Sequence, residues 1–415
     1  MIKVPKEVTK IMKTLGDAGF ENYVTGECVI DSMMGEKTYS WDVITKAGFE
    51  ELTELFPEAK ILSTKYSVLR EELIDEICNE KGEVIGEEGY IIDISTYRTK
   101  NASESSGDDE NLFTDNVEED LARRDFTIDA IAMNPYAGVK PIVDPYEGRE
   151  DVRKKIIKTV GEASESFRKE PIRMMKAIRY AAQFGFDLHK SVYEAIVANY
   201  SLLETVKPEK IRDEFTDIMA APHAGKGLNM LMNTGLLRVI LGEQQFSRLT
   251  RREKSDLMAL CEGIEKTKQV PERRLGLFYS TIHKKRSMPS IDKLNFYEET
   301  HQHLVDAVHD MPKLYFTAQP QDLKKFIYDR SMERYEYLLN LEKAQRLAFD
   351  YDSETKIRSK MYMLGEIKKN NEVIFVEDLA VDANDLIEAG ICDETNVEKM
   401  LVMLTESTHV RPKNC

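Results

Sequence analysis

Two adjacent arginines stand between acids on both sides in one short stretch, which reads Glu119-Asp120-Leu121-Ala122-Arg123-Arg124-Asp125-Phe126-Thr127-Ile128-Asp129-Ala130. The guanidinium group is a planar fork that matches phosphate oxygens, and lysine cannot copy that geometry. Such a cluster can also be a surface ion-pair network that caps a helix. We expect the apolar residues after Thr127 to begin that helix, and both interpretations of the arginines remain open.

Two further acids, Asp42 and Asp93, lie in segments that read as β-strands. Residues 41–44 and 90–97 are rich in apolar and branched side chains, and Gly89 precedes the second segment. Carboxylate oxygens from adjacent strands are ligands that Mg²⁺ prefers. Each acid could equally be a strand-end carboxylate that binds no metal.

The remaining elements of the first ~100 residues alternate helix and strand, the rhythm of an α/β unit. Apolar residues recur at helical spacing near the N-terminus, at Val8, Ile11, Met12 and Leu15. A short strand at residues 23–24 leads to Gly26, and residues 28–34 read as a helix closed by Gly35. These elements must position the acids and arginines described above.

Together these segments resemble the RNA 3′-end nucleotidyltransferases, a family that includes the class II CCA-adding enzymes and the bacterial poly(A) polymerases. The family combines a Gly-Gly loop, a helix with Val-Arg-Asp, an Asp-x-Asp strand and a third acid on a later strand. The resemblance implies that Asp42 and Asp93 are catalytic residues and ligands of Mg²⁺. It also implies nucleotide-binding roles for Gly26, Arg123, Arg124, Asp125 and Asp129, with Asp125 near the ribose.

Three residues near the predicted metal site depart from the family pattern. Ser40 stands at the first aspartate, and a neutral hydroxyl is a weak Mg²⁺ ligand. Glu27 stands at the second glycine and adds negative charge where the backbone should approach phosphate. Ile30 replaces an arginine. Because the loss of one such electrostatic group commonly lowers a rate by about 10²–10³-fold, we expect activity to be reduced or lost.

A second nucleotide-binding segment is predicted in residues 167–180. In the CCA-adding enzymes an acid and an arginine on one helix hydrogen-bond the base edge of CTP or ATP, which points here to Glu170 and Arg173, with Arg179 further along. We expect Lys169-Glu170-Pro171-Ile172-Arg173 to lie on the same helix as an apolar stripe. That stripe contains Met174, Met175, Ile178, Ala181 and Ala182. Lys169, Arg173, Lys176 and Tyr180 are expected on the opposite face.

Charge is unevenly distributed along the 415 residues, whose net charge is −16. This balance argues against a generally basic nucleic-acid-binding surface but allows a local one. Residues 149–190 are such a basic block, and we predict RNA contacts at Arg153, Lys154 and Lys155. Residues 101–120 hold eight acids and no lysine or arginine. We predict a mobile surface loop there, either a linker or a catalytic lid.

The five cysteines are odd in number and scattered, which is typical of free thiols in a reducing cytoplasm. No secretory signal is visible at the N-terminus. No uninterrupted apolar run approaches the ~20 residues needed to cross a bilayer. We therefore expect a cytoplasmic protein with no membrane partner.

The predicted fold class is α+β, with a small mixed-sheet nucleotidyltransferase head followed by an all-helical neck, body and tail. We place the head at residues 1–134, the nucleotide-reading neck at 135–204, the body at 205–315 and the RNA-binding tail at 316–415. The implied partners are the tRNA 3′ end, CTP and ATP. Three hypotheses remain: an active or weakly active enzyme, a pseudoenzyme that binds tRNA-like RNA or nucleotide, and a nucleotide-sensing or protein-interaction scaffold.

Overall fold

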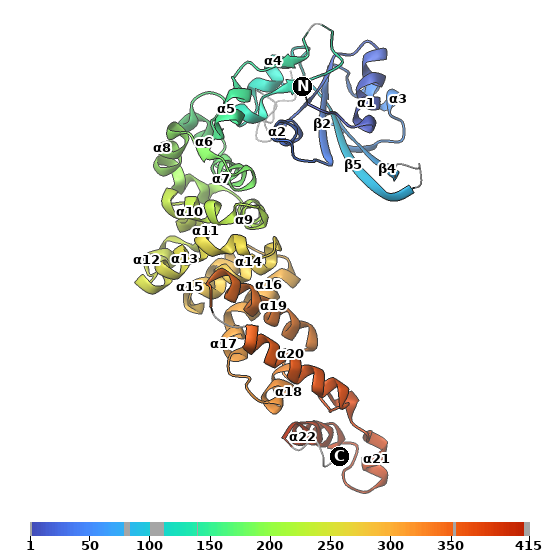
Figure 1. Cartoon of the computed structure of the whole chain (residues 1–415), viewed down its shortest axis with the longest axis vertical. Coiled ribbons are helices and arrows are strands. Elements are labelled where there is room, and N and C mark those ends of the chain that lie inside the picture. Colours follow the sequence, from blue (N-terminus) through green and yellow to red (C-terminus); the bar gives the residue numbers. More distant parts are fainter. Residues whose placement is uncertain (1, 79–83, 100–111, 139, 352–353, 411–415) are drawn as a thin grey trace. The chain divides into compact units, whose positions relative to one another are not determined.

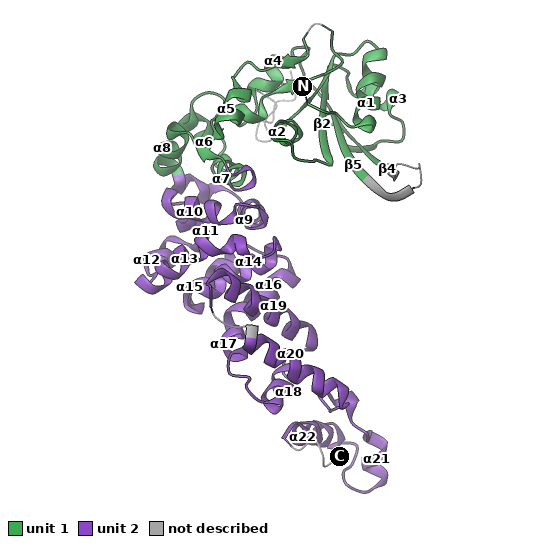
Figure 2. Cartoon of the chain, in the orientation of Figure 1, with its two compact units in different colours: residues 1–181, 186–199 green, residues 182–185, 200–415 purple. Residues whose placement is uncertain are grey.

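The computed structural model combines a mixed β-sheet with helices in the first part of the chain and consists of helices in the rest (Figure 1). It describes residues 2–78, 84–99, 112–138, 140–351 and 354–410. Two compact units are present: Met1–Ala181 with Phe186–Asn199, and Ala182–Gly185 with Tyr200–Cys415 (Figure 2). The fold class predicted from the sequence is confirmed. The four-way domain division stays a prediction.

The first unit is built on a seven-stranded sheet with the order β3-β4-β5-β2-β1-β6-β7. Only β2 and β5 pair in parallel among these neighbours. The strand bounds are β1 Asn22–Thr25, β2 Ser40–Thr45, β3 Lys60–Ser63, β4 Val68–Cys78, β5 Val84–Thr96, β6 Ala132–Met133 and β7 Ile142–Val143. The three strands predicted at residues 23–24, 41–44 and 90–97 are therefore confirmed.

Helices cover this sheet and continue beyond it. Their bounds are α1 Lys6–Asp17, α2 Glu27–Met34, α3 Phe49–Leu55, α4 Val117–Ala122, α5 Gly148–Lys154, α6 Ala163–Lys169, α7 Arg173–Phe184 and α8 Lys190–Asn199. The four apolar residues predicted to line the first helix are all buried in α1. Helix α2 ends as predicted at Gly35, whose φ of 80° is left-handed. Two short strands, β8 Ile156–Ile157 and β9 Asp187–Leu188, form a separate parallel pair.

Two predictions around the arginine cluster are wrong in part. Residues 101–111 lie outside the described residues, but α4 begins at Val117, inside the predicted loop. Its Asp120 side chain is fully buried, because it faces Arg123 and Arg124 and not solvent. After Thr127 the chain forms only the 3₁₀ turn η1, Thr127–Asp129, and then enters β6. The predicted helix is wrong because the apolar residues after Thr127 are buried against the sheet and continue into a strand.

The predicted single helix around residue 170 is interrupted. Helix α6 ends at Lys169 and α7 begins at Arg173, so Glu170 lies in the junction beside Pro171. Proline cannot continue the hydrogen-bond ladder of a helix interior, which explains the break. The apolar stripe of α7 is buried as predicted. Tyr180 is buried too, because its ring packs edge-on against Phe126 at 5.5 Å between centroids.

The described part of the second unit is helical, as predicted. Its α-helices are α9 Pro208–Ala220, α10 Ala224–Thr234, α11 Leu236–Leu241, α12 Glu243–Ser247, α13 Arg251–Gly263, α14 Pro271–Thr281, α15 Lys284–Lys293, α16 Glu298–His309, α17 Met311–Leu314, α18 Pro320–Tyr328, α19 Met332–Ala348, α20 Glu354–Lys369, α21 Ala383–Glu388 and α22 Val397–Val410. The 3₁₀ helices η2 Tyr200–Thr205, η3 Ile264–Lys266 and η4 Val376–Asp378 connect them. No helix in the described residues is long and apolar enough to cross a membrane.

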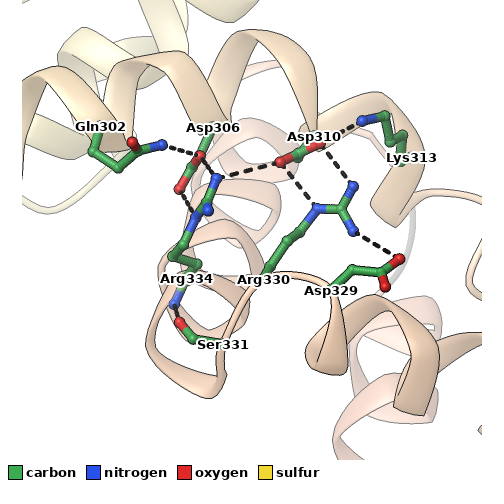
Figure 3. Close-up of polar contacts among 8 residues, drawn as sticks. All are labelled: Gln302, Asp306, Asp310, Lys313, Asp329, Arg330, Ser331 and Arg334. Carbon is green, nitrogen blue, oxygen red and sulfur yellow. Dashed lines mark hydrogen bonds and ion pairs between the residues drawn. The ribbon is translucent and has the colours of Figure 1, made fainter. Parts of the chain in front are cut away.

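An ion-pair network ties α16, α17 and α19 together in the second unit (Figure 3). Arg334 donates from Nε to Asp306 at 2.6 Å, and Asp306 is fully buried. Arg330 and Lys313 both bind Asp310, at 2.9 Å and 2.7 Å. Because each buried acid has a charged partner, these carboxylates are neutralised inside the network and leave little chemistry for a ligand.

Glu253 lies in the first turn of α13 and offers a test of pH-dependent stability in this unit. Its carboxylate accepts hydrogen bonds from the backbone N–H groups of Thr250 and His283 and from the Arg286 guanidinium. Burial alone would raise the pKa of Glu253, but these donors lower it from its ordinary 4.5 to about 2. Because the pKa of Glu253 is lower in the folded chain than in the unfolded one, its ionised carboxylate stabilises the fold fully above pH 4.5. This contribution to the free energy of unfolding is lost as the pH falls toward 2.

We expect Glu253→Gln to lower the free energy of unfolding by about 1.5–3 kcal/mol at pH 7, the range for hydrogen bonds to a charged group. The difference from wild type should shrink below pH 4.5, because Glu253 then takes up a proton in the unfolded chain while it stays ionised in the folded one. Urea unfolding at pH 7 and pH 3.5 measures both values. The exposed Glu262 on the same helix gives the control Glu262→Gln, and equal losses in the two variants would contradict the prediction.

Candidate functional site

Three neighbouring strands bring Asp42, Asp93 and Arg70 into one row. In the register of the sheet Asp42 on β2 lies opposite Asp93 on β5, and Asp93 lies opposite Arg70 on β4. Residues directly opposite each other on paired strands point to the same face. Arg70 binds both oxygens of Asp93, with Nε to Oδ1 at 2.7 Å and Nη2 to Oδ2 at 2.8 Å. The sequence predicted the two acids but not the arginine.

Gly26 lies against Asp42 at the start of α2. Its φ is +80°, and a Cβ placed there would lie 2.8 Å from Asp42 Oδ2 and 3.5 Å from Arg124 Nη1. Only glycine suits this position, because a side chain would be strained and would collide with the carboxylate. Burial raises the pKa of Asp42 to about 6, with Arg124 opposing the shift and Asp93 adding to it.

The donor set on these strands does not fit a divalent-metal centre. Of the two carboxylates in the row, the fork of Arg70 already covers both oxygens of Asp93. Ser40 lies two residues before Asp42 on β2 and adds a hydroxyl only. Within the described residues no group of three or more His, Cys, Asp or Glu side chains could hold a metal ion. The predicted Mg²⁺ ligands, Asp42 and Asp93, stay a prediction that this geometry does not favour.

The predicted arginine cluster forms a buried ion-pair network. Arg124, only 12% exposed, lies 3.5 Å from Asp120 and 3.6 Å from Asp129. Arg123 binds the other Asp120 oxygen at 3.0 Å. Burial alone would raise the pKa of Asp120, but the two arginines hold that pKa below its ordinary value. The network is thus buried, although the alternative drawn from the sequence placed it on the surface.

A cavity of about 510 Å³ opens beside this network. Arginine and lysine side chains line much of it, namely Arg98, Arg123, Arg124, Lys169, Arg173 and Lys176. The Nε atoms of Arg98 and Arg124 are buried there and lack a hydrogen-bond partner within the described residues. Burial, together with the charges of Arg123 and Arg124, lowers the pKa of Arg98 to about 10. The guanidinium groups gathered in this lining suit a polyanion such as a triphosphate.

The far wall of the cavity comes from α6, α7 and their junction. Asp125 lies between Arg173, 2.6 Å from its Oδ1, and Lys176, 3.0 Å from its Oδ2. Arg173 also binds Glu170 at 2.9 Å. The structure therefore brings together most of the predicted nucleotide-binding residues, which were far apart in the sequence. Arg98 and Lys176 complete the cavity, and sequence reasoning assigned neither of them to nucleotide binding.

Comparison with models of known protein families gives two matches along the chain. Residues 22–158 match the poly A polymerase head domain, and residues 185–246 match the probable RNA and SrmB-binding site of polymerase A. We call residues 22–158, which match this model, the head domain. The sheet row, Gly26 and the arginine cluster all lie in this head domain.

Individual relatives agree with that assignment. A CCA-adding enzyme of Geobacillus thermodenitrificans is 33% identical over 243 residues, which cover 58% of this chain and 56% of the relative. One of Lactobacillus helveticus is 34% identical over 243 residues, or 57% of each chain. This chain thus spans little more than half the length of the curated relatives it matches. The crystal structure of the Bacillus stearothermophilus CCA-adding enzyme in complex with CTP matches 98% of the chain with a TM-score of 0.75 and 24% identity, covering 93% of its own length.

Glu27 in the head domain has a charged partner on α7. Arg179 donates from Nη1 to Glu27 Oε1 at 2.9 Å, and its guanidinium lies 4.5 Å from the centroid of the Tyr180 ring. The predicted nucleotide-binding Arg179 is thereby joined to α2, and it does not line the cavity. The negative charge of Glu27, which stands where the family has a glycine, is balanced by this contact with Arg179.

The predicted RNA contacts are exposed at the end of α5, apart from the cavity lining. Arg153 and Lys154 both pair with Glu150, at 3.1 Å and 3.4 Å. Lys155 follows as the left-handed C-cap of the helix, with a φ of 56°. Exposed ion pairs of this kind contribute little stability, so these side chains can exchange Glu150 for a phosphate.

Proposed function

We propose that the chain binds CTP or ATP and the 3′ end of tRNA in the cytoplasm, as a protein of the CCA-adding type, and transfers CMP or AMP slowly. The observation that carries the proposal is the arginine-lined cavity of about 510 Å³ in the first unit, one wall of which comes from the head domain and the other from α6, α7 and their junction. Its volume suits a drug-sized or nucleotide-sized ligand. The match of residues 22–158 to a poly A polymerase head domain supports nucleotide chemistry there.

The nucleotide would lie with its phosphates on the arginine side of the cavity. Arg98, Arg123 and Arg124 supply forked donors for the triphosphate. Glu170 and Arg173 on the opposite wall would meet the base edge, and Asp125, which pairs with Arg173, would meet the ribose. This assignment uses the residues predicted from the sequence and adds Arg98.

We expect the transfer to be slow because the strands that carry Asp42 and Asp93 lack the full set of metal-binding carboxylates. Nucleotidyl transfer in this family calls for Mg²⁺ on three carboxylates, and this chain offers Asp42 and an Asp93 that Arg70 holds. The loss of one preorganised electrostatic group costs about 10²–10³-fold in rate. We therefore place the chain between an active enzyme and a nucleotide-binding pseudoenzyme.

The test is an incubation of the full chain with tRNA lacking its 3′ CCA, Mg²⁺, and labelled CTP and ATP. We expect CTP binding in equilibrium dialysis and label in tRNA only after long incubation. Binding without any label would establish the pseudoenzyme. Failure of both nucleotides to bind would overturn the proposal and favour a protein-interaction scaffold.

The basic end of α5 carries a separate prediction on tRNA. Reversing Arg153, Lys154 and Lys155 to glutamate should abolish tRNA binding, because three phosphate contacts become repulsive. In wild type each neutralised phosphate adds about 0.7–0.9 to the slope of log affinity against log salt. The net charge of −16 opposes encounter, so binding should be measurable at low salt only.

Filter binding across a salt series measures this effect. The matched control reverses Arg251, Arg252 and Lys254, which changes the net charge equally at the start of α13. The control should retain most of the tRNA affinity. Equal losses in both triple variants would show that tRNA responds to overall charge and not to α5.

A further inference from the structure

Arg70 places a positive charge beside Asp93, where the family pattern predicts a divalent metal ion. The register of β4, β5 and β2 puts Arg70, Asp93 and Asp42 side by side on one face of the sheet. The guanidinium of Arg70 binds both Asp93 oxygens at 2.7 Å and 2.8 Å, a bidentate fork. The two side chains are only 32% and 26% exposed, so the pair is partly withdrawn from water.

A divalent ion and this guanidinium compete for the same carboxylate. A hard cation binds Asp93 by coordinating oxygen lone pairs that Arg70 now engages, and it would stand close to a fixed positive charge. Ser40 offers a neutral hydroxyl in place of a further carboxylate. The donor chemistry of the row therefore favours the internal cation over a bound one.

Charge compensation by arginine extends through the rest of the described site. Glu27 pairs with Arg179, Asp120 with Arg123 and Arg124, and Asp125 with Arg173 and Lys176. Arg98 adds a buried Nε without a partner in the described residues. A triphosphate entering the cavity thus meets Asp125 and Glu170 with arginine or lysine partners already in place.

Resting on the proposed function, we propose that Arg70 takes the place of the divalent cation and that the cavity binds the metal-free form of a nucleoside triphosphate. Asp42 is linked to the cavity through Gly26, because a Cβ on Gly26 would touch both the Asp42 carboxylate and Arg124. In the row of strands the Arg70 guanidinium offsets the charge of Asp93, so no magnesium ion is needed there to balance that carboxylate. Nucleotide affinity then does not depend on divalent metal.

The experiment compares CTP binding by the full chain in EDTA and in Mg²⁺, using labelled CTP in equilibrium dialysis. We expect wild type to bind CTP with similar affinity in both conditions. Arg70→Met should lower the affinity in EDTA by at least about tenfold, and Mg²⁺ should recover part of it. Electron paramagnetic resonance with Mn²⁺ should show weak binding in wild type and stronger binding in Arg70→Met, where Asp93 is free.

Controls separate this inference from the proposed function and from misfolding. Arg238→Met removes another arginine that pairs with an acid, at 2.8 Å from Glu243, and should change neither measurement. Arg70→Lys keeps a charge without the fork and should lie between wild type and Arg70→Met. CTP binding that requires Mg²⁺ in wild type would overturn the inference and leave the proposed function standing. No CTP binding in either condition would overturn both, and the wild-type comparison holds even if Arg70→Met does not fold.

Discussion

Arg124→Met should abolish detectable CTP binding and destabilise the head domain by about 3–5 kcal/mol, the cost of breaking a buried ion pair by removing one partner. Arg124 is 12% exposed and lies between the carboxylates of Asp120 and Asp129. Its removal leaves Asp120, which is fully buried, with Arg123 and the backbone N–H of Arg98 as partners. Dialysis measures the dissociation constant of CTP, and urea unfolding measures stability.

A second substitution separates the structural role of Arg124 from its role in binding. Arg124→Met with Asp129→Asn removes the carboxylate charge that loses its ion pair and should recover part of the lost stability. It should not recover CTP binding, because the donor that faces the cavity is still missing. Arg123→Met, at a side chain 21% exposed, should cost less stability and weaken CTP by roughly 1.5–3 kcal/mol. A folded Arg124→Met variant that binds CTP as wild type does would make the cluster purely structural.

Local patterns predicted the elements that carry the acids. The β-branched run of β5 and the glycine that closes α2 are visible within a few residues of sequence. The resemblance to a family placed Asp42 and Asp93 together, and the register of β2 and β5 agrees with that placement. The break before α7 was also readable in principle, because Pro171 stands just before the first helical residue.

Contacts between distant segments could not be predicted in the same way. Strand β4 carries Arg70, Glu71 and Glu72, whose charges hide the alternation of a strand. The fork of Arg70 on Asp93 joins residues 23 positions apart, and the pair of Arg179 with Glu27 joins residues 152 apart. Neither contact follows from local periodicity, because each depends on the register of the sheet or the packing of α7.

These long-range pairs change the meaning of the departures seen in the sequence. Ser40 and Glu27 each read as the loss of a favourable group. In the structure Glu27 has gained Arg179, and the row weakened by Ser40 contains Arg70. Because an uncompensated buried charge is costly, these arginines let the head domain keep its fold with an altered set of acids.

The last prediction concerns a double variant that adds a carboxylate at residue 40 and removes the guanidinium of Arg70. Ser40→Asp combined with Arg70→Met should strengthen Mn²⁺ binding and raise the incorporation of labelled CMP into tRNA by about 10²–10³-fold, the effect of restoring one electrostatic group. Ser40 and Asp42 lie two residues apart on β2, so the new carboxylate points to the face that carries Asp42 and the freed Asp93.

The single variants show which change matters. Ser40→Asp alone should gain less, because Arg70 still covers both oxygens of Asp93. Adding Asp42→Asn to the double variant should return Mn²⁺ affinity and incorporation to the wild-type level, and Ser247→Asp on the exposed face of α12 controls for an added charge. If the folded double variant binds Mn²⁺ no better than wild type, the strands that carry Asp42, Asp93 and Arg70 are not an altered metal site. The low rate of transfer must then have its cause in the residues that line the cavity.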